Sequence, residues 1–124
     1  MVTTKLDYGD IPPTWETVKK RILGMKDSGF VTLSVDDGSS LILHFVERLG
    51  YMGVYSGTGE ENLAVIDQSL GNEIVMAFDG GFTSNLIRRC SFVSAPLALQ
   101  IAEHFFLTGK RDPSAEWVLK STQC

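Results

Sequence analysis

Positive charge is scarce in the middle of this chain. Between Phe30 and Phe82 the only base is Arg48, and the other ten of the eleven Lys and Arg residues lie outside this segment. Nucleic-acid binders need clustered Lys and Arg to displace counterions, so the segment is excluded as a direct nucleic-acid surface. The same segment carries eight acids, namely Asp36, Asp37, Glu47, Glu60, Glu61, Asp67, Glu73 and Asp79. Two interpretations stay open: acids that keep strand ends soluble, or a surface for a basic partner.

Long apolar runs and cysteines are also scarce. No segment approaches the roughly 20 apolar residues that cross a bilayer, and the N-terminal MVTTKLDYGDIPP has no apolar run of signal-peptide length. We therefore expect no membrane partner and a cytoplasmic location. The two cysteines, Cys90 and Cys124, form no CxxC or metal-ligand spacing. We expect free thiols, no metal and no cofactor.

The remaining composition is that of one ordinary domain. The 124 residues are 44% hydrophobic and 21% charged, which is enough to bury a core within a single unit covering residues 1–124. A net charge of −4 and the absence of an obvious apolar patch in the sequence make a monomer the expected free state.

Two helices are predicted, one near each end. Thr14 is a plausible cap for a first helix whose apolar stripe ends at Ser28-Gly29. Ser94 and Pro96 open a second helix with a wide apolar face, and Gly109 with the following Lys-Arg and Pro113 closes it. His104 on this helix has no metal-spaced companion, so we interpret it as structural.

Between the helices the apolar period changes to two. The stretches Phe30 to Val35 and Leu41 to Val46 flank Asp36-Asp37-Gly38 and predict a β-hairpin. Further strand candidates are Tyr51 to Tyr55, Leu63 to Ile66, Glu73 to Phe78, Leu86 to Val93 and a short return through Trp117 to Leu119. The linkers are too short for parallel crossovers. We predict an α+β fold: a mostly antiparallel sheet of about five to seven strands, with the N-terminal and C-terminal helices packed on one face.

No motif predicts a reaction. The glycine-rich stretch Gly53 to Gly59 lacks the Gly-Lys-Ser/Thr ending of a phosphate loop, and the adjacent Glu60 and Glu61 would diverge in an extended segment. Cys90 is interpreted as an ordinary strand cysteine, not as a thiolate paired with a histidine. We therefore expect a protein without catalysis. The alternative is a cone-shaped ligand-binding protein or enzyme whose pocket is lined by His44, Tyr55 and Asp67.

The C-terminal segment is the most distinctive. From Ser94 it reads SAPLALQIAEHFFLTGKRDPSAEW, a helix opened by Ser-Ala-Pro, an Ile-Ala and Phe-Phe pattern, Thr-Gly-x-Arg, a proline and then Trp117. Together with the order of strands from Phe30 to Phe82, this segment resembles the first-numbered immunity protein family of bacterial polymorphic toxin systems.

The resemblance implies a small cytoplasmic protein that binds and inactivates one cognate toxin domain, commonly a nucleic-acid deaminase or nuclease, in a 1:1 complex. An acidic surface suits the basic cleft of such a toxin. The family pattern does not assign contact residues, so we select acids beside turns and nearby aromatics of the kind that anchor interfaces. The predicted toxin-binding residues are Tyr51, Tyr55, Glu60, Glu61, Asp67, Asp79 and Phe82.

Overall fold

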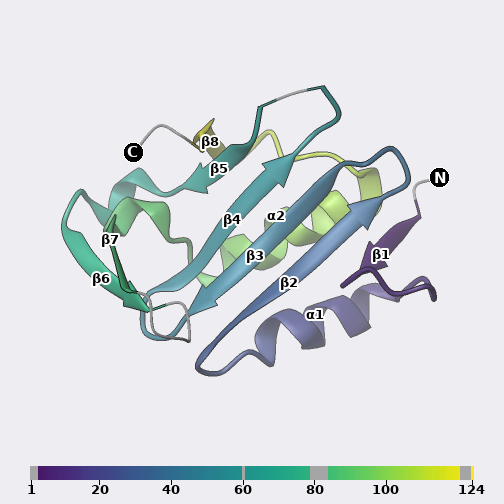
Figure 1. The fold of residues 1–124 in the computed structure, drawn as a ribbon, viewed down its shortest axis with the longest axis horizontal. Helices are drawn as coiled ribbons and strands as arrows, with labels where there is room; N and C mark the ends of the chain where they lie inside the picture. Colours follow the sequence, from purple (N-terminus) through teal and green to yellow (C-terminus); the bar gives the residue numbers. More distant parts are fainter. Residues whose placement is uncertain (1–2, 60, 79–83, 121–123) are drawn as a thin grey trace.

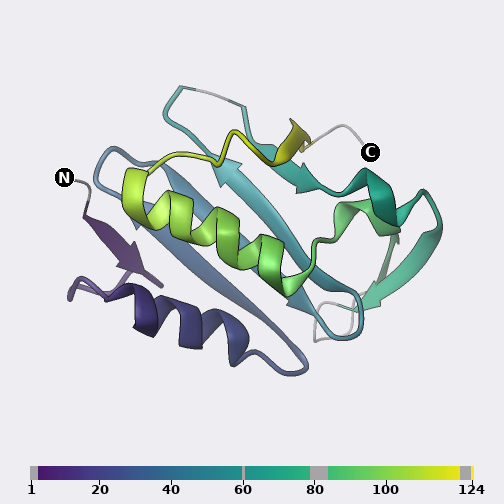
Figure 2. The ribbon, with the colours of Figure 1, turned by 180° about the vertical axis from the view of Figure 1, so that it is seen from behind.

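The computed structural model describes residues 3–59, 61–78, 84–120 and 124. Its main sheet has six antiparallel strands in the order β1-β2-β3-β4-β5-β8 (Figure 1). Both helices lie on the same face of this sheet, as Figure 2 shows from behind. The predicted α+β class and the placement of the helices are confirmed. The strands are β1 (Thr4–Leu6), β2 (Ser28–Val35), β3 (Ser40–Val46), β4 (Gly50–Ser56), β5 (Leu63–Ile66), β6 (Ile74–Phe78), β7 (Ser84–Arg88) and β8 (Glu116–Leu119).

Three of the four helix ends match the prediction, but the first helix ends at Leu23, before Gly24, and not at Ser28-Gly29, which begin strand β2. Helix α1 (Trp15–Leu23) starts after Thr14, whose hydroxyl accepts a hydrogen bond from the Thr17 N–H at 3.2 Å. Helix α2 (Ala95–Thr108) starts after Ser94, but the Ser94 side chain makes no capping hydrogen bond, contrary to our expectation. Gly109 ends α2 in the left-handed conformation, with φ 72°. None of the helices among the described residues is both long and apolar enough to cross a membrane.

The strand predictions need three corrections. A short N-terminal strand, β1, pairs with β2 and was not foreseen. Strand β7 ends at Arg88, because the chain turns there into a 3-10 helix, η2 (Arg89–Ser91). Strands β6 and β7 pair only with each other in the described structure, so they form a separate two-stranded sheet and the expected single sheet is wrong. This hairpin projects from the end of the main sheet at which β3 turns into β4 (Figure 1).

The main core lies between the sheet and the helices. Residues of β2, β3 and β4 alternate between this core and the opposite face, as the period of a strand requires. Val18 and Ile22 from α1 and Ile101 and Phe105 from α2 complete the core. A second, smaller cluster of Val46, Ala77 and Phe92 fixes the β6–β7 hairpin to the opposite side of β3. Burial on this scale contributes about 2 kcal/mol for each large side chain.

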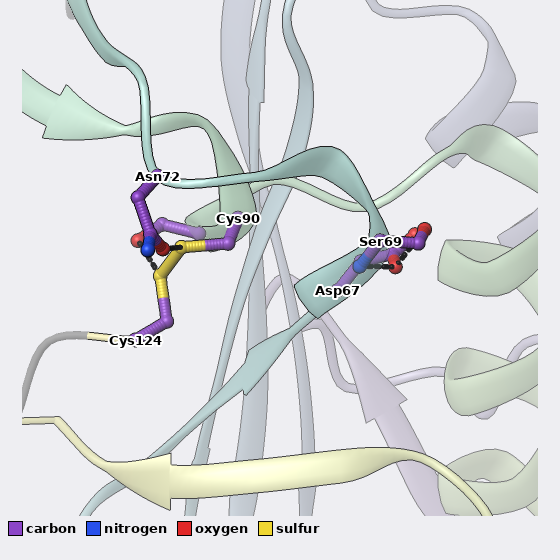
Figure 3. Close-up of a disulfide and its surroundings, with 6 residues drawn as sticks. Asp67, Ser69, Asn72, Cys90 and Cys124 are labelled. Atoms are coloured by element: carbon purple, nitrogen blue, oxygen red, sulfur yellow. Dashed lines mark hydrogen bonds between the residues drawn. A yellow bond between two sulfur atoms is a disulfide. The ribbon is translucent and has the colours of Figure 1, made fainter.

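The two cysteines form a disulfide, so the prediction of free thiols is wrong. Cys90 in η2 is bonded to Cys124, with their Cα atoms 6.3 Å apart (Figure 3). The backbone of η2 is held in turn by a second 3-10 helix, η1 (Gln68–Leu70), through the Asp67 N–H that donates to the Cys90 carbonyl at 2.8 Å. The pairing escaped prediction because 34 residues separate the cysteines and only the fold brings them together.

Candidate partner-binding surface

The acids of the central segment lie in turns and loops. Of those that the structure describes, Asp36, Asp37, Glu47, Glu61, Asp67 and Glu73 all fall between strands. Strands β2 to β5 carry no Asp, Glu, Lys or Arg at all. These central strands are therefore uncharged, and the acids of the segment lie at the two ends of the strands.

One acidic end is formed by the β2–β3 turn and the β4–β5 loop. The Thr58 hydroxyl donates to the Asp37 carbonyl at 2.6 Å and so joins the two loops. The Ser39 N–H donates to Asp37 Oδ1 at 2.8 Å, and this hydrogen bond lowers the pKa of the Asp37 carboxyl below its usual value. Asp37 therefore stays charged at neutral pH, beside the exposed Glu61 loop.

The other end of these strands carries both acids and bases, and exposed apolar side chains as well. On the outer face of the β6–β7 hairpin, Ile74, Met76 and Leu86 are 58%, 56% and 70% exposed. Met76 lies directly opposite Leu86 in the register, and Ile74 lies opposite Arg88. The inner face of the same hairpin packs Val75 and Ile87 against the second core cluster. The hairpin is therefore apolar on both faces, and we call Ile74, Met76 and Leu86 the hairpin patch.

A groove adjoins the hairpin patch. Its volume is about 460 Å³, and Met76 forms part of its wall. Its other lining residues come from the start of β2 and the β3–β4 turn: Asp27, Ser28, Val46, Glu47, Arg48 and Leu49. An apolar lining with two carboxylates and one guanidinium is suited to an apolar side chain with a basic neighbour. Contiguous exposed apolar surface beside such a depression is typical of protein-binding sites.

The turn that lines this groove is held in an uncommon conformation. Arg48 has a φ of 71°, in the left-handed region that side chains seldom adopt. Gly50, two residues further along, has a φ of 113°, and a Cβ atom built on it would lie 2.6 Å from the Val93 carbonyl oxygen. The Glu47 N–H donates to the Asp27 carbonyl at 3.1 Å, which ties the turn to the loop before β2. The groove is thus built on backbone that its surroundings fix.

Tyr51 and Tyr55, selected as interface anchors, are core residues. They are 4% and 6% exposed and both face the helices. The Tyr51 hydroxyl donates to the Ile22 carbonyl at 3.1 Å, and burial raises the pKa of Tyr51. The aromatic rings fill the space between sheet and helices, so they have almost no surface left for a partner. The interpretation of these two tyrosines as contact residues is therefore corrected.

The remaining predicted contact residues are distributed. Glu61 is exposed just before β5. Asp67 caps η1, accepting hydrogen bonds from the Ser69 N–H at 3.1 Å and the Ser69 hydroxyl at 2.6 Å (Figure 3). Its carboxylate therefore has a structural partner. Glu60, Asp79 and Phe82 lie outside the described residues.

The alternative pocket of His44, Tyr55 and Asp67 does not assemble. His44 lies on the face of the sheet away from the helices, where its ring stacks on Phe30 with centroids 4.2 Å apart. Tyr55 faces the opposite side, toward Phe105. Asp67 caps η1 near the disulfide (Figure 3). The sheet separates the first two side chains, so these three residues share no cavity.

The distinctive C-terminal segment has a structural explanation. The Trp117 indole N–H donates to the Asp112 carbonyl at 2.8 Å, across the loop that follows Gly109. Phe105 is fully buried, and the Tyr55 ring packs edge to face with the rings of both Phe105 and Trp117. These residues specify how α2 returns to the sheet, so they determine packing and do not form a binding surface.

Sequence reasoning missed the hairpin patch. The alternation of Ile74 and Met76 with Val75 and Ala77 predicts a strand with two apolar faces, as a fully buried strand would have. A buried strand and an exposed one give the same sequence pattern. The groove residues Asp27, Glu47 and Leu49 are far apart or lie in turns, and only the fold brings them beside Met76. Comparisons of the chain with models of protein families, with curated proteins and with solved structures find no match.

Proposed function

We propose that this chain is an immunity protein: a binding protein that neutralises a cognate bacterial toxin domain, a nucleic-acid deaminase or nuclease with a basic cleft. The observation that carries the proposal of a binding role is the hairpin patch beside the groove edged by Asp27 and Glu47. The toxin as partner rests on the resemblance of the segment from Ser94 to Trp117. The protein is proposed to act without catalysis, as a free monomer that forms a 1:1 complex.

The chemistry of the surface matches such a partner. The hairpin patch offers exposed apolar surface from Ile74, Met76 and Leu86. Burying this surface against a partner contributes about 25 cal/mol of binding free energy for each Å² removed from water. Basic groups of a partner are attracted by Asp27 and Glu47 at the groove and by the acids of the β2–β3 turn and the β4–β5 loop, and this attraction raises the association rate. A stable complex buries on the order of 1,600 Å² in total, so the interface extends beyond the patch itself.

The experiment is co-expression with the C-terminal domain encoded by the neighbouring gene. Host survival is recorded, the pair is recovered by pull-down, and the molar mass of the complex is determined by light scattering. Rescue with a 1:1 complex supports the proposal. Toxicity without rescue would contradict it. A homodimer whose interface is the hairpin patch would assign that patch to a second copy of this chain instead.

A matched pair of variants locates the interface. Leu86→Lys places a cation in the hairpin patch, whereas Leu107→Lys places the same charge on helix α2, where Leu107 is 64% exposed. Both changes suit their local structure, since lysine is tolerated on a hairpin edge and near a helix C-terminus. We expect L86K to weaken toxin binding at least tenfold and L107K to leave it unchanged. Equal effects would remove the hairpin patch from the interface.

The compartment is part of the proposal. A protein that protects its producer from a toxin acting on nucleic acid is expected in the cytoplasm, where thiols are kept reduced. The Cys90–Cys124 disulfide is typical instead of an oxidising compartment. Alkylation of thiols in intact cells, followed by mass spectrometry of the protein, distinguishes a reducing cytoplasm from an oxidising compartment. Two alkylated cysteines support the cytoplasm, and an intact disulfide would contradict that location.

A further inference from the structure

The edge strands of this fold differ in how they are protected. An edge strand leaves N–H and C=O groups without a ladder partner, and proteins usually place charge or proline on it to discourage pairing with another chain. In the main sheet, edge strand β1 carries Lys5 and edge strand β8 carries Glu116. In the two-stranded sheet, β7 carries Arg88, whereas β6 reads Ile-Val-Met-Ala-Phe. Among the edge strands that the structure describes, β6 is thus the one without a charged residue or a proline.

The register of the hairpin shows which backbone groups of β6 point away from β7. The Arg89 N–H donates to the Glu73 carbonyl at 2.8 Å, so the residue pair just before the hairpin is a hydrogen-bonded one. Antiparallel ladders alternate hydrogen-bonded pairs with pairs that exchange no hydrogen bond. The pairs formed by Ile74 and Met76 are of the second kind. Their N–H and C=O groups therefore point to the outer edge of β6, and within the described residues β6 pairs with β7 only.

The open edge and the hairpin patch belong to the same residues. Ile74 and Met76 contribute exposed apolar side chains to the patch, and together they offer two N–H donors and two C=O acceptors at the edge. Strand β6 lies at the outer margin of this end of the molecule in both Figure 1 and Figure 2. A strand added there would gain main-chain hydrogen bonds and cover apolar side chains at the same time.

The groove lies on the β6 side of the hairpin. Within the described part of the chain, it takes its hairpin wall from Met76 and none from β7. A segment that runs along the outer edge of β6 therefore passes beside the groove. Asp27 and Glu47, both exposed, line the groove against the single base Arg48. The excess of carboxylates favours a segment that carries a Lys or an Arg.

We propose that the toxin domain binds by adding one of its strands to the outer edge of β6, with a Lys or Arg of that strand reaching Asp27 and Glu47. The inference rests on the proposed function and specifies its mode of binding. In strand addition, main-chain hydrogen bonds supply affinity and alternate side chains supply specificity. A second copy of this chain fits less well, because its own β6 carries no base to meet the two carboxylates.

Amide hydrogen exchange of the ¹⁵N-labelled protein, alone and with the toxin domain, tests the proposal residue by residue. Met76 and Leu86 are matched, since they lie opposite each other in the register and their N–H groups point to opposite edges of the hairpin. We expect the toxin to slow exchange of the Met76 amide at least about tenfold more than that of Leu86, as one added hydrogen bond requires. Equal slowing at both amides would overturn the proposal. Slowing at Met76 that increases with the concentration of the protein alone would assign the edge to a second copy, which also overturns it.

Proline variants separate the backbone from the side chain. Met76→Pro removes the outward N–H without removing a hydrogen bond to β7, and proline is tolerated where the N–H of an edge strand faces solvent. Met76→Val keeps the N–H and is the reference for the lost side chain. Leu86→Pro and Leu86→Val form the same pair on the opposite edge. We expect M76P to bind the toxin at least about tenfold more weakly than M76V, and L86P to match L86V within about twofold.

The outcomes distinguish this inference from the proposed function. A wild type that does not bind the toxin overturns both. Wild-type binding that M76P and M76V retain equally, with folding verified by their spectra, overturns strand addition at β6 and leaves the proposed function standing. If Met76→Pro prevents folding, the comparison of the Met76 and Leu86 amides in the wild type decides.

Discussion

The disulfide gives the sharpest prediction about stability. Cys124→Ser removes the cross-link and keeps the fully buried Cys90 in its place beside Asn72. The cross-link joins residues 34 positions apart, and it restricts the unfolded chain by closing that loop. The chain-entropy relation for a loop of this length gives about 4 kcal/mol at 25 °C. For a chain of this size, such a loss lowers the melting temperature by roughly 15 °C.

The assay is guanidinium unfolding followed by circular dichroism, with and without a reductant. Oxidised wild type is expected to exceed C124S in unfolding free energy by about 4 kcal/mol, and reduction is expected to bring wild type down to the variant. Reduction should leave C124S itself unchanged, which makes it the control. The reasoning is refuted if mass spectrometry shows the disulfide intact in wild type and the unfolding free energies of wild type and C124S, both without reductant, differ by less than about 1 kcal/mol.

Three further predictions concern single side chains. Gly50→Ala is expected to lower the free energy of unfolding by about 3 kcal/mol, because φ is positive and the new Cβ would contact the Val93 carbonyl. Gly59→Ala, at a φ of 73° with open space around it, should lower the free energy of unfolding less, and equal melting temperatures of the two variants would contradict this. Burial opposes ionisation of Asp112, but hydrogen bonds from Gln100 and Ser114 outweigh it and lower the pKa of this carboxyl from 3.8. The ionised Asp112 carboxylate therefore stabilises the fold at neutral pH, and this stabilisation is lost as the pH falls through the lowered pKa. Below about pH 4, Asp112→Asn should lose less stability than wild type does, and parallel acid-unfolding curves for the two proteins would argue against this. Glu47→Lys is expected to slow association with the toxin more than Glu61→Lys, because Glu47 lines the groove and Glu61 lies at the other end of the strands. Association rates are measured by stopped flow at low salt, and the reverse order of the two variants would place the interface at the β4–β5 loop.

Much of the fold follows from local sequence signals. Thr14 before an apolar stripe and Gly109 before Pro113 determine helix ends through hydrogen bonds within a few residues. The Asp36-Asp37-Gly38 turn is equally local, with Gly38 at a φ of 93°. Such signals depend on neighbouring residues only, so they can be recognised before the fold is known.

The errors concern contacts between distant residues. Tyr51 and Tyr55 lie in an alternating strand, and the sequence pattern does not reveal which of its two faces the helices cover. The Cys90–Cys124 pairing depends on where η2 and the C-terminal residue meet in space. The hairpin patch was missed because an exposed apolar strand and a buried one look alike in sequence. Which apolar residues are buried and which are exposed is therefore the property that the sequence predicts least well.

Hydrogen exchange on the complex tests the central claim most directly. The claim is that the hairpin patch and its adjoining groove bind the protein partner. The account predicts that the partner slows amide exchange in residues 74–78, 84–88 and 46–49, and leaves α2 and the loop after Gly109 unchanged. Slower exchange confined to α2 and that loop, with no change in the hairpin, would contradict it.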